Sequence, residues 1–352
     1  MATSYTQFSS NDHVDSIDRV FSSAWSGNTN ELTTAFSSST QYVTSNPTAS
    51  GAFYMDIYDK APTGASADAT AEIQYSIAFG HLLGSGGMDF NDDAGAGGYS
   101  STMATYMQYR NLVFGGDETQ NFNFNGHTPE GIYIININRA RYKNAIRMGN
   151  LALNLSGSTN LLHLTDDSVT TSGSANAIRA GVGREFNIVS GSNGVRSGDS
   201  NIYVTNSGSY GYVYPDAGLI ILNADALDES AANEGIALGT NISADTAGLN
   251  PKRLQDAITL GGSFIVDSQE DIASKYYFIR AYNNTFNYTT NDSFTTTDGT
   301  LNYDSMIDNP QVYITTVGLY NDNQDLLAVA KLSQPLAKNF TKEALIKVKL
   351  DY

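Results

Sequence analysis

The residues best suited to chemistry are thinly spread along the sequence. Four histidines, His13, His81, His127 and His163, lie tens of residues apart, so none forms the His-Glu-x-x-His spacing that places two metal ligands on one helix face. There is no Gly-x-Ser-x-Gly turn for a serine nucleophile and no glycine loop that ends in Lys-Ser or Lys-Thr to hold a phosphate. The absence of cysteine excludes thiolate metal sites, disulfides and cysteine nucleophiles. We therefore predict that the protein is not an enzyme and holds no cofactor.

Three groups of carboxylates deserve separate consideration. Asp89, Asn91 and Asp93 alternate as the oxygen ligands of a calcium loop do, but alanine follows where the sharp turn needs glycine, and Ser100 stands where a glutamate should close the site. We interpret this stretch, within the glycine-rich loop 84–98, as an acidic loop and predict no metal. The adjacent pairs 166–167 and 270–271 are interpreted as solvated loop carboxylates, since adjacency does not create the separation of about 5–10 Å that glycoside hydrolysis requires.

A basic cluster gathers Arg139, Arg141, Lys143 and Arg147 within nine residues. The whole chain carries 19 basic and 36 acidic residues, a formal net charge of −17. Such a field repels polyanions and anionic bilayers, and no apolar run is long enough to cross a membrane. We therefore expect neither nucleic acid nor membrane as a partner. The cluster is interpreted as a salt-bridging patch that faces acidic loops or a neighbouring subunit.

The hydrophobic pattern alternates with the period of two that is typical of strands. It predicts a mainly β protein of α+β type, built of antiparallel β-sandwich or barrel-like modules with a few short helices and an extended N-terminal arm. Strands are expected in eleven segments, and helices at 100–114 and just after Pro251. The expected strands are 53–59, 72–79, 132–138, 151–155, 160–164, 185–189, 201–205, 218–222, 276–282, a hairpin at 312–332, and 344–350.

We divide the chain into an N-terminal helix and arm at 1–50, an α+β module at 51–130, a β-rich module at 131–265 and a C-terminal β module at 266–352. In the last module, the hairpin at 312–332 and the strand at 344–350 are expected to pack together.

The two ends of the chain are predicted to contact partners. Val14, Ile17 and Val20 suggest an amphipathic helix, but residues 1–50 hold too few apolar positions to fold alone. Three large aromatic residues are therefore expected to bury themselves in a partner surface: Phe21, Trp25 and Phe36. At the other end, residues 331–352 carry a local net charge of +3. Lys347 and Lys349 could meet an acidic neighbour, or could protect an edge strand from unwanted pairing.

The C-terminal third resembles structural proteins of large contractile-tailed bacteriophages. The similarity lies in residues 276–288 (YYFIRAYNNTFNY), 309–321 (NPQVYITTVGLYN), 326–335 (LLAVAKLSQP) and 343–352 (EALIKVKLDY). The resemblance implies a virion protein of the tail, baseplate or neck, made in the bacterial cytoplasm. It would act by assembly with other virion proteins, as a homo-oligomer within a symmetric particle. A carbohydrate-binding adhesin module, a capsid-surface decoration protein and a glycan-degrading tail enzyme remain alternatives.

Overall fold

The structure is a computed structural model. It describes residues 6–29, 31–32, 36–37, 54–63, 65–86, 101–117, 119–158, 160–197, 205–242, 249–288 and 292–352. The chain forms two compact units, and the boundaries between them lie within two strands, β1 (His13–Ser23) and β15 (Asp267–Ala281). Unit 1 comprises Met1–Arg19 and Asp271–Tyr352, and unit 2 comprises Val20–Glu270.

Unit 2 is built on a twelve-stranded sheet, whose described strand pairs are all antiparallel. The main path runs β14–β7–β8–β10–β12–β13–β5–β4–β3–β2, and β9 and β11 pair with β10. The strands are β2 (Phe36–Ser37), β3 (Tyr54–Tyr58), β4 (Ile73–His81), β5 (Gly131–Ile137), β7 (Ala152–Ser156), β8 (Leu161–Asp166), β9 (Ala177–Arg179), β10 (Gly183–Ser192), β11 (Val195–Arg196), β12 (Gly211–Tyr214), β13 (Leu219–Asn223) and β14 (Ser263–Ile265).

The central strands of this sheet are buried on both faces. In β5, Ile132 and Ile134 belong to one apolar cluster, whereas Tyr133, Ile135 and Ile137 belong to another. Because successive side chains point to opposite faces of a strand, the two clusters lie on the two sides of the sheet. This double burial explains why β5 and β13 read as almost continuous apolar runs.

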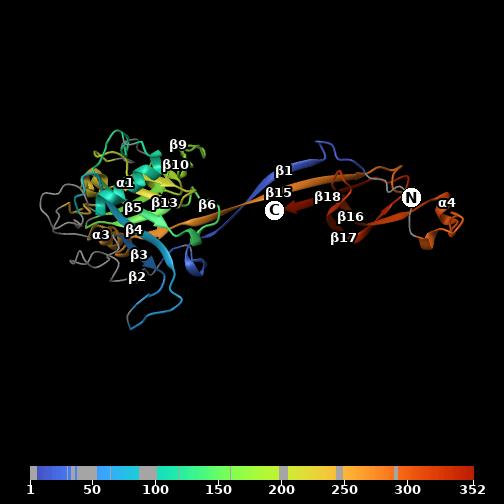
Figure 1. The fold of residues 1–352 in the computed structure, drawn as a ribbon, viewed down its shortest axis with the longest axis horizontal. Helices are drawn as coiled ribbons and strands as arrows, with labels where there is room; N and C mark the ends of the chain where they lie inside the picture. Colours follow the sequence, from blue (N-terminus) through green and yellow to red (C-terminus); the bar gives the residue numbers. More distant parts are fainter. Residues whose placement is uncertain are drawn as a thin grey trace. The chain divides into compact units, whose positions relative to one another are not determined.

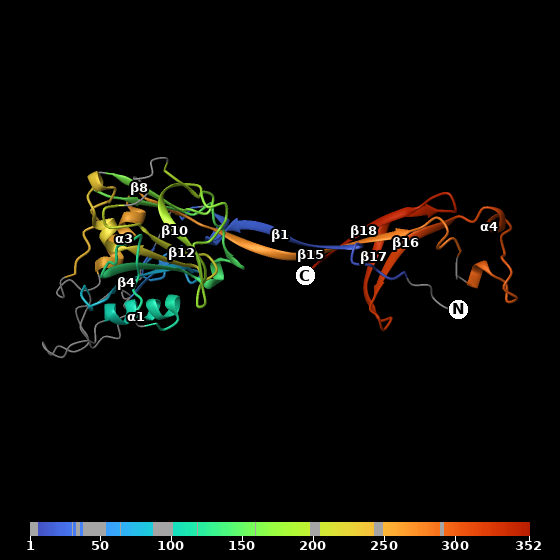
Figure 2. The ribbon, with the colours of Figure 1, turned by 90° about the horizontal axis from the view of Figure 1, so that it is seen from above.

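Helices cover the two faces of the sheet (Figures 1 and 2). On one face lies α1 (Ser101–Phe114), which contributes Tyr106 and Val113 to one cluster. A Cβ at Gly80 of β4 would lie 3.0 Å from the Tyr106 Cα and N atoms, so the missing side chain lets α1 approach closely. On the other face, α3 (Leu249–Thr259) contributes Leu254, Ala257 and Ile258 to the second cluster. A third helix, α2 (Ala224–Asp228), directly follows β13.

Unit 1 contains two sets of strands. β15 lies between β1 and β18 (Ala344–Asp351), while its residues Ser268 and Gln269, which belong to unit 2, pair with the short β6 (Ala145–Ile146). β16 (Val312–Tyr320) and β17 (Leu326–Lys338) form a separate two-stranded ribbon (Figure 2). The helix α4 (Ser305–Asp308) precedes the ribbon.

The predicted fold class is confirmed, since the protein is mainly β, with large antiparallel sheets that include a half-barrel and with few helices. The helices predicted at 100–114 and after Pro251 and the predicted hairpin are present as α1, α3 and β16–β17. The expected boundary at residue 130 separates β4 from β5, but these strands are direct neighbours in one sheet. The segments 51–130 and 131–265 therefore share a core.

One local prediction is wrong. Residues around Val14, Ile17 and Val20 form the strand β1 instead of a helix, because pairing with β15 satisfies their main-chain groups and suits their β-branched side chains. The strand β18 pairs along its whole length with β15, from Ser274 opposite Asp351 to Ala281 opposite Ala344. It is therefore a neighbour of β15 in the sheet, whereas the hairpin at 312–332 forms a sheet of its own, whose strand β17 contacts β18.

Candidate functional site

The four histidines lie in separate parts of the described structure. His81 is buried in β4, where its Nδ1 accepts hydrogen bonds from the Leu83 and Ser85 amides, and burial lowers the pKa of its imidazole. The His163 Nδ1 lies 2.8 Å from the Asn154 Oδ1 on the neighbouring strand. Within the described part of the chain, no group of three or more His, Asp or Glu side chains could hold a metal ion. The calcium-like residues 89–94 and Ser100 lie outside the described residues.

The interpretation of Asp166 and Asp167 as solvated loop carboxylates is wrong, because both residues are buried. Asp166 accepts hydrogen bonds from the amides of Gly149 and Ser168. Asp167 accepts from the Asn187 backbone at 3.1 Å and side chain at 2.7 Å. The two carboxylates thus organise the turn after β8, a role that residue adjacency could not reveal. The other pair remains partly solvated, with Asp271 lying 3.5 Å from the Arg19 Nε.

The predicted basic cluster forms contacts within unit 2. Arg141 forms an ion pair with Glu72 at 2.8 Å and also donates to the Ser26 hydroxyl. Arg139 donates to the Tyr142 carbonyl at 2.6 Å and lies over its ring. These contacts use the guanidinium groups of Arg139 and Arg141 within unit 2.

Lys143 and Arg147 complete the same cluster. The Lys143 side chain is exposed, while its backbone amide donates to the Ser268 hydroxyl. Arg147 forms an ion pair with Asp267 at 3.1 Å and stacks 4.2 Å from the centre of the Phe21 ring. Phe21, a predicted partner contact, therefore has one face covered by this chain and remains 44% exposed.

The prediction that Trp25 is buried in a partner surface is wrong, because this chain buries it. It is only 2% exposed, its indole N–H donates to the Phe264 carbonyl at 2.9 Å, and its ring packs against Tyr75 and Phe264. The prediction failed because the sheet that receives Trp25 is formed by residues far along the sequence. Phe36 lies in β2 opposite Tyr58, and its side chain is outside the described residues.

The C-terminal lysines cover aromatic and acidic groups of unit 1. The Lys347 ammonium lies 4.0 Å from the centre of the Tyr276 ring. Lys349 contacts Asp18 at 2.7 Å and Asp351 at 3.1 Å. Its hydrogen bond to Asp18 is the main cause that lowers the pKa of that carboxyl and raises the pKa of Lys349.

The ribbon of unit 1 carries an exposed apolar surface. A Cβ at Gly318 would lie 2.9 Å from the Tyr320 ring and 3.3 Å from the Leu326 Cδ1, so these two side chains lie over Gly318. Val329 is the direct partner of Gly318 across the ribbon. Tyr320, Leu326, Leu327 and Val329 are between 44% and 68% exposed, and we call them the ribbon patch.

A polar pocket of about 450 Å³ lies in unit 2, where strands β10 and β12 meet three connecting segments. The β10 residues Glu185, Asn187 and Val189 alternate along one face of that strand and line the pocket beside Tyr212 of β12. The remaining described lining comes from Asn123, Asn125, Asp167, Thr170, Thr171, Asn176, Arg196 and Ser209. The sequence analysis missed this pocket, because its residues come from separate elements and share no motif.

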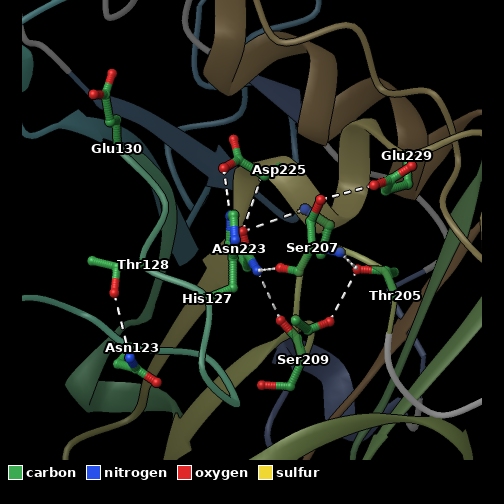
Figure 3. A network of polar contacts seen from close by, with 12 residues as sticks. Asn123, His127, Thr128, Glu130, Thr205, Ser207, Ser209, Asn223, Asp225 and Glu229 are labelled. Atoms are coloured by element: carbon green, nitrogen blue, oxygen red, sulfur yellow. Dashed lines mark hydrogen bonds and ion pairs between the residues drawn. The ribbon is translucent and has the colours of Figure 1, made fainter. Parts of the chain in front are cut away.

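A network of hydrogen bonds holds one wall of the pocket in place (Figure 3). The buried Asn223 side chain donates to the carbonyls of Ser207 and Ser209, at 2.7 and 3.0 Å, and accepts from the amides of Asp225 and Ala226 at the start of α2. The His127 Nε2 lies 2.8 Å from the Asp225 Oδ2 and joins the 123–127 turn to that helix. These contacts fix the loop at 205–209 against the turn.

Comparison with protein-family models, with curated proteins and with solved structures finds no match. The ribbon patch of unit 1 and the polar pocket of unit 2 are therefore the two candidate functional features of this protein. Among the helices that the structure describes, none combines the length and apolarity needed to cross a membrane.

Proposed function

We propose that this protein is a structural subunit of a tailed-bacteriophage virion, in the tail, baseplate or neck, and that it acts by protein–protein assembly through unit 1. The observation that carries the proposal is the lack of an apolar core in unit 1. Both apolar clusters of the described residues lie within unit 2. In the described part of unit 1, the buried apolar side chains are only Ala281, Leu319, Ala344 and Val348.

The ribbon explains why this lack points to assembly. An isolated two-stranded hairpin is marginally stable in water and gains stability when an apolar face packs against another element. The ribbon patch offers such a face, since Tyr320, Leu326, Leu327 and Val329 are exposed together. Exposed apolar patches of this kind are typical of protein–protein contacts.

The resemblance to virion proteins falls on the same part of the molecule. Its four sequence strings, 276–288, 309–321, 326–335 and 343–352, supply the C-terminal part of β15 and most of β16, β17 and β18. The expected partners are other virion proteins and further copies of this chain, and the expected location is the virion. Unit 1 supports assembly as the activity and provides no observation that favours a capsid-surface decoration protein over a tail protein.

The test is a competition for incorporation into virions. A chain with Leu327→Asp and Val329→Asp should keep the fold of unit 2, because both residues are exposed and lie on a strand of unit 1. We expect it to be depleted from purified particles relative to the parent chain produced in the same cells. Ile178→Asp is the matched control, since Ile178 is an 81% exposed apolar strand residue of unit 2. Equal incorporation of the ribbon variant and the control would refute the proposal.

A further inference from the structure

The polar pocket of unit 2 has the size of a small-molecule site. Its volume of about 450 Å³ lies within the range of about 300–1,000 Å³ that is common for such sites. Four amide side chains line it, namely Asn123 and Asn125 of one segment together with Asn176 and Asn187. Amides both donate and accept hydrogen bonds, so the pocket offers both kinds of group in several directions.

Several polar groups of the pocket have unused hydrogen-bonding capacity. Ser209 is 4% exposed, and its hydroxyl has no hydrogen-bond partner among the described residues. The Asn223 side chain donates to the Ser209 carbonyl and leaves this hydroxyl without a hydrogen bond among the described residues (Figure 3). The Asn176 side chain is exposed and forms no hydrogen bond with the described part of the chain. Such groups gain most from a ligand that supplies matching hydroxyls.

Other pocket groups are held rigidly by the protein. The Glu185 carboxylate receives two hydrogen bonds from Arg179 and one from Tyr214. Tyr212 donates its hydroxyl to the Asn123 carbonyl and stacks on Phe124 with 5.0 Å between ring centres. A fixed lining reduces the conformational entropy that binding would otherwise cost.

The lining also restricts the chemistry of the ligand. Val189 is the single aliphatic side chain of the described lining, so an apolar ligand would leave polar groups without partners. Asp167 and Glu185 oppose an anion, and Arg196 is the one basic residue of the described lining. The described residues offer no group of three ligands for a cation. A neutral ligand with many hydroxyl groups and a ring satisfies all three restrictions.

We propose that this pocket binds a neutral saccharide unit. The Asn125, Asn176 and Ser209 side chains would exchange hydrogen bonds with its hydroxyl groups, the Asp167 carboxyl would accept from one of them, and Tyr212 would contact the ring. This role goes beyond assembly and involves unit 2 alone, so its failure leaves the proposed function of unit 1 untouched.

The experiment is titration of the full-length protein with a panel of free saccharides, measured by isothermal calorimetry and ligand-observed NMR. The panel contains neutral hexoses, N-acetylhexosamines, their short oligomers and the corresponding uronic acids. We expect saturable binding of at least one neutral member and weaker binding of its uronic acid, because Asp167 and Glu185 repel a carboxylate. Binding confined to oligomers would assign the ligand to a polysaccharide chain, whereas equal binding of the monomer would assign it to a free sugar.

Variants locate the binding on the protein. Asn176→Ala removes an amide with no hydrogen bond to the described protein and should weaken binding about five- to tenfold. Asn309→Ala is the matched control, because Asn309 is an exposed asparagine of unit 1 and should leave affinity unchanged. The proposal is overturned if no neutral saccharide binds, or if Asn176→Ala binds as tightly as the parent chain.

Discussion

The two units of this protein both have strands with apolar side chains, but they differ in how far those side chains are buried. Unit 2 buries Trp25, Tyr75, Tyr133 and Phe264 with at most 2% of each residue exposed. Unit 1 has strands with comparable apolar content, yet Leu327 remains 68% exposed. The difference lies in what covers the strands. In unit 2, the helices α1 and α3 and the returning segments of the sheet provide the second layer, whereas the described residues of unit 1 provide almost none.

This contrast shows that alternation of apolar residues does not by itself create a core. Alternation places apolar side chains on one face of a strand, but burial requires a second layer against that face. Where the chain does not supply that layer, another chain can. The following predictions test this difference between the units, from the largest effect to the smallest.

The largest loss of stability should follow Trp25→Ala in unit 2. The substitution creates a cavity between Tyr75 and Phe264 and removes the donor to the Phe264 carbonyl. We expect the free energy of unfolding to fall by about 3–5 kcal/mol, measured by urea unfolding followed by circular dichroism. The matched change in unit 1, Leu327→Ala, should cost less than about 0.5 kcal/mol, because its side chain is exposed. Equal losses would mean that unit 1 has a core after all.

A smaller loss should follow Val348→Asp, at one of the few buried apolar positions of unit 1. Val348 lies opposite Tyr277 and is 7% exposed. A buried carboxylate at this position would have no positively charged partner, so local stability should fall by about 3 kcal/mol. The loss should be seen as faster hydrogen exchange of the β15 and β18 amides. Val329→Asp on the ribbon should leave exchange in those strands unchanged. Protection that survives in the Val348 variant would contradict the assigned burial.

Breaking an ion pair should also cost more stability in unit 2 than in unit 1. Glu185 of unit 2 has a side chain only 4% exposed, and Arg179 holds it through two hydrogen bonds. Arg179→Met should cost about 2 kcal/mol, a value reduced from that of a fully buried pair because the arginine is 31% exposed. Lys349→Met breaks an exposed pair of unit 1 and should change the unfolding midpoint little at physiological salt. The reverse order of effects would contradict the contrast.

Much of the fold can be predicted from the sequence where local pattern and burial agree. The apolar run of β13, the alternation in β4 and the Pro-containing start of α3 all predicted the correct element. The strand β1 was mistaken for a helix because its apolar spacing also fits a helix, and only pairing with β15 decides between the two. The destination of Trp25 was missed for a related reason, because its neighbour Phe264 lies 239 residues away in the chain.

The candidate sites were harder to predict than the elements. The aromatic residues and lysines near the chain ends were predicted to contact partners because such residue types are common in interfaces. Several of them instead contact other residues of the same chain. The ribbon patch was not recognised, because exposure depends on the absence of a covering layer. The pocket depends on the register that sets Tyr212 opposite Asn187 and on the buried cap Asn223. No spacing rule in the sequence reports either of these.

The smallest expected effect concerns acid: as the pH falls, one carboxyl group of unit 1 should lose a stabilising contribution, whereas one carboxyl group of unit 2 should lose a destabilising one. Asp18 in unit 1 has its pKa lowered below 3.8, chiefly by the hydrogen bond from Lys349. Its contribution to stability is therefore present above the unfolded pKa and is lost as the pH falls through the folded value. Asp167 in unit 2 has its pKa raised above 3.8, chiefly by burial, although Asn187 donates to it. Its ionised form costs stability, and that cost is relieved as the pH falls through the folded value.

Carboxyl ¹³C titration by NMR measures both groups in one sample. We expect the Asp167 midpoint to lie above 3.8 and the Asp18 midpoint to lie below it. Lys349→Met should move the Asp18 midpoint upward, because the ammonium that favours the ionised carboxylate is gone, and should leave Asp167 unchanged because burial sets its pKa. Removing the Asn187 amide with Asn187→Leu should raise the Asp167 midpoint further and leave Asp18 unchanged. Coincident midpoints in the parent chain would show that the two carboxyls share one solvated environment, which would remove the electrostatic part of the contrast between a covered unit and an uncovered one.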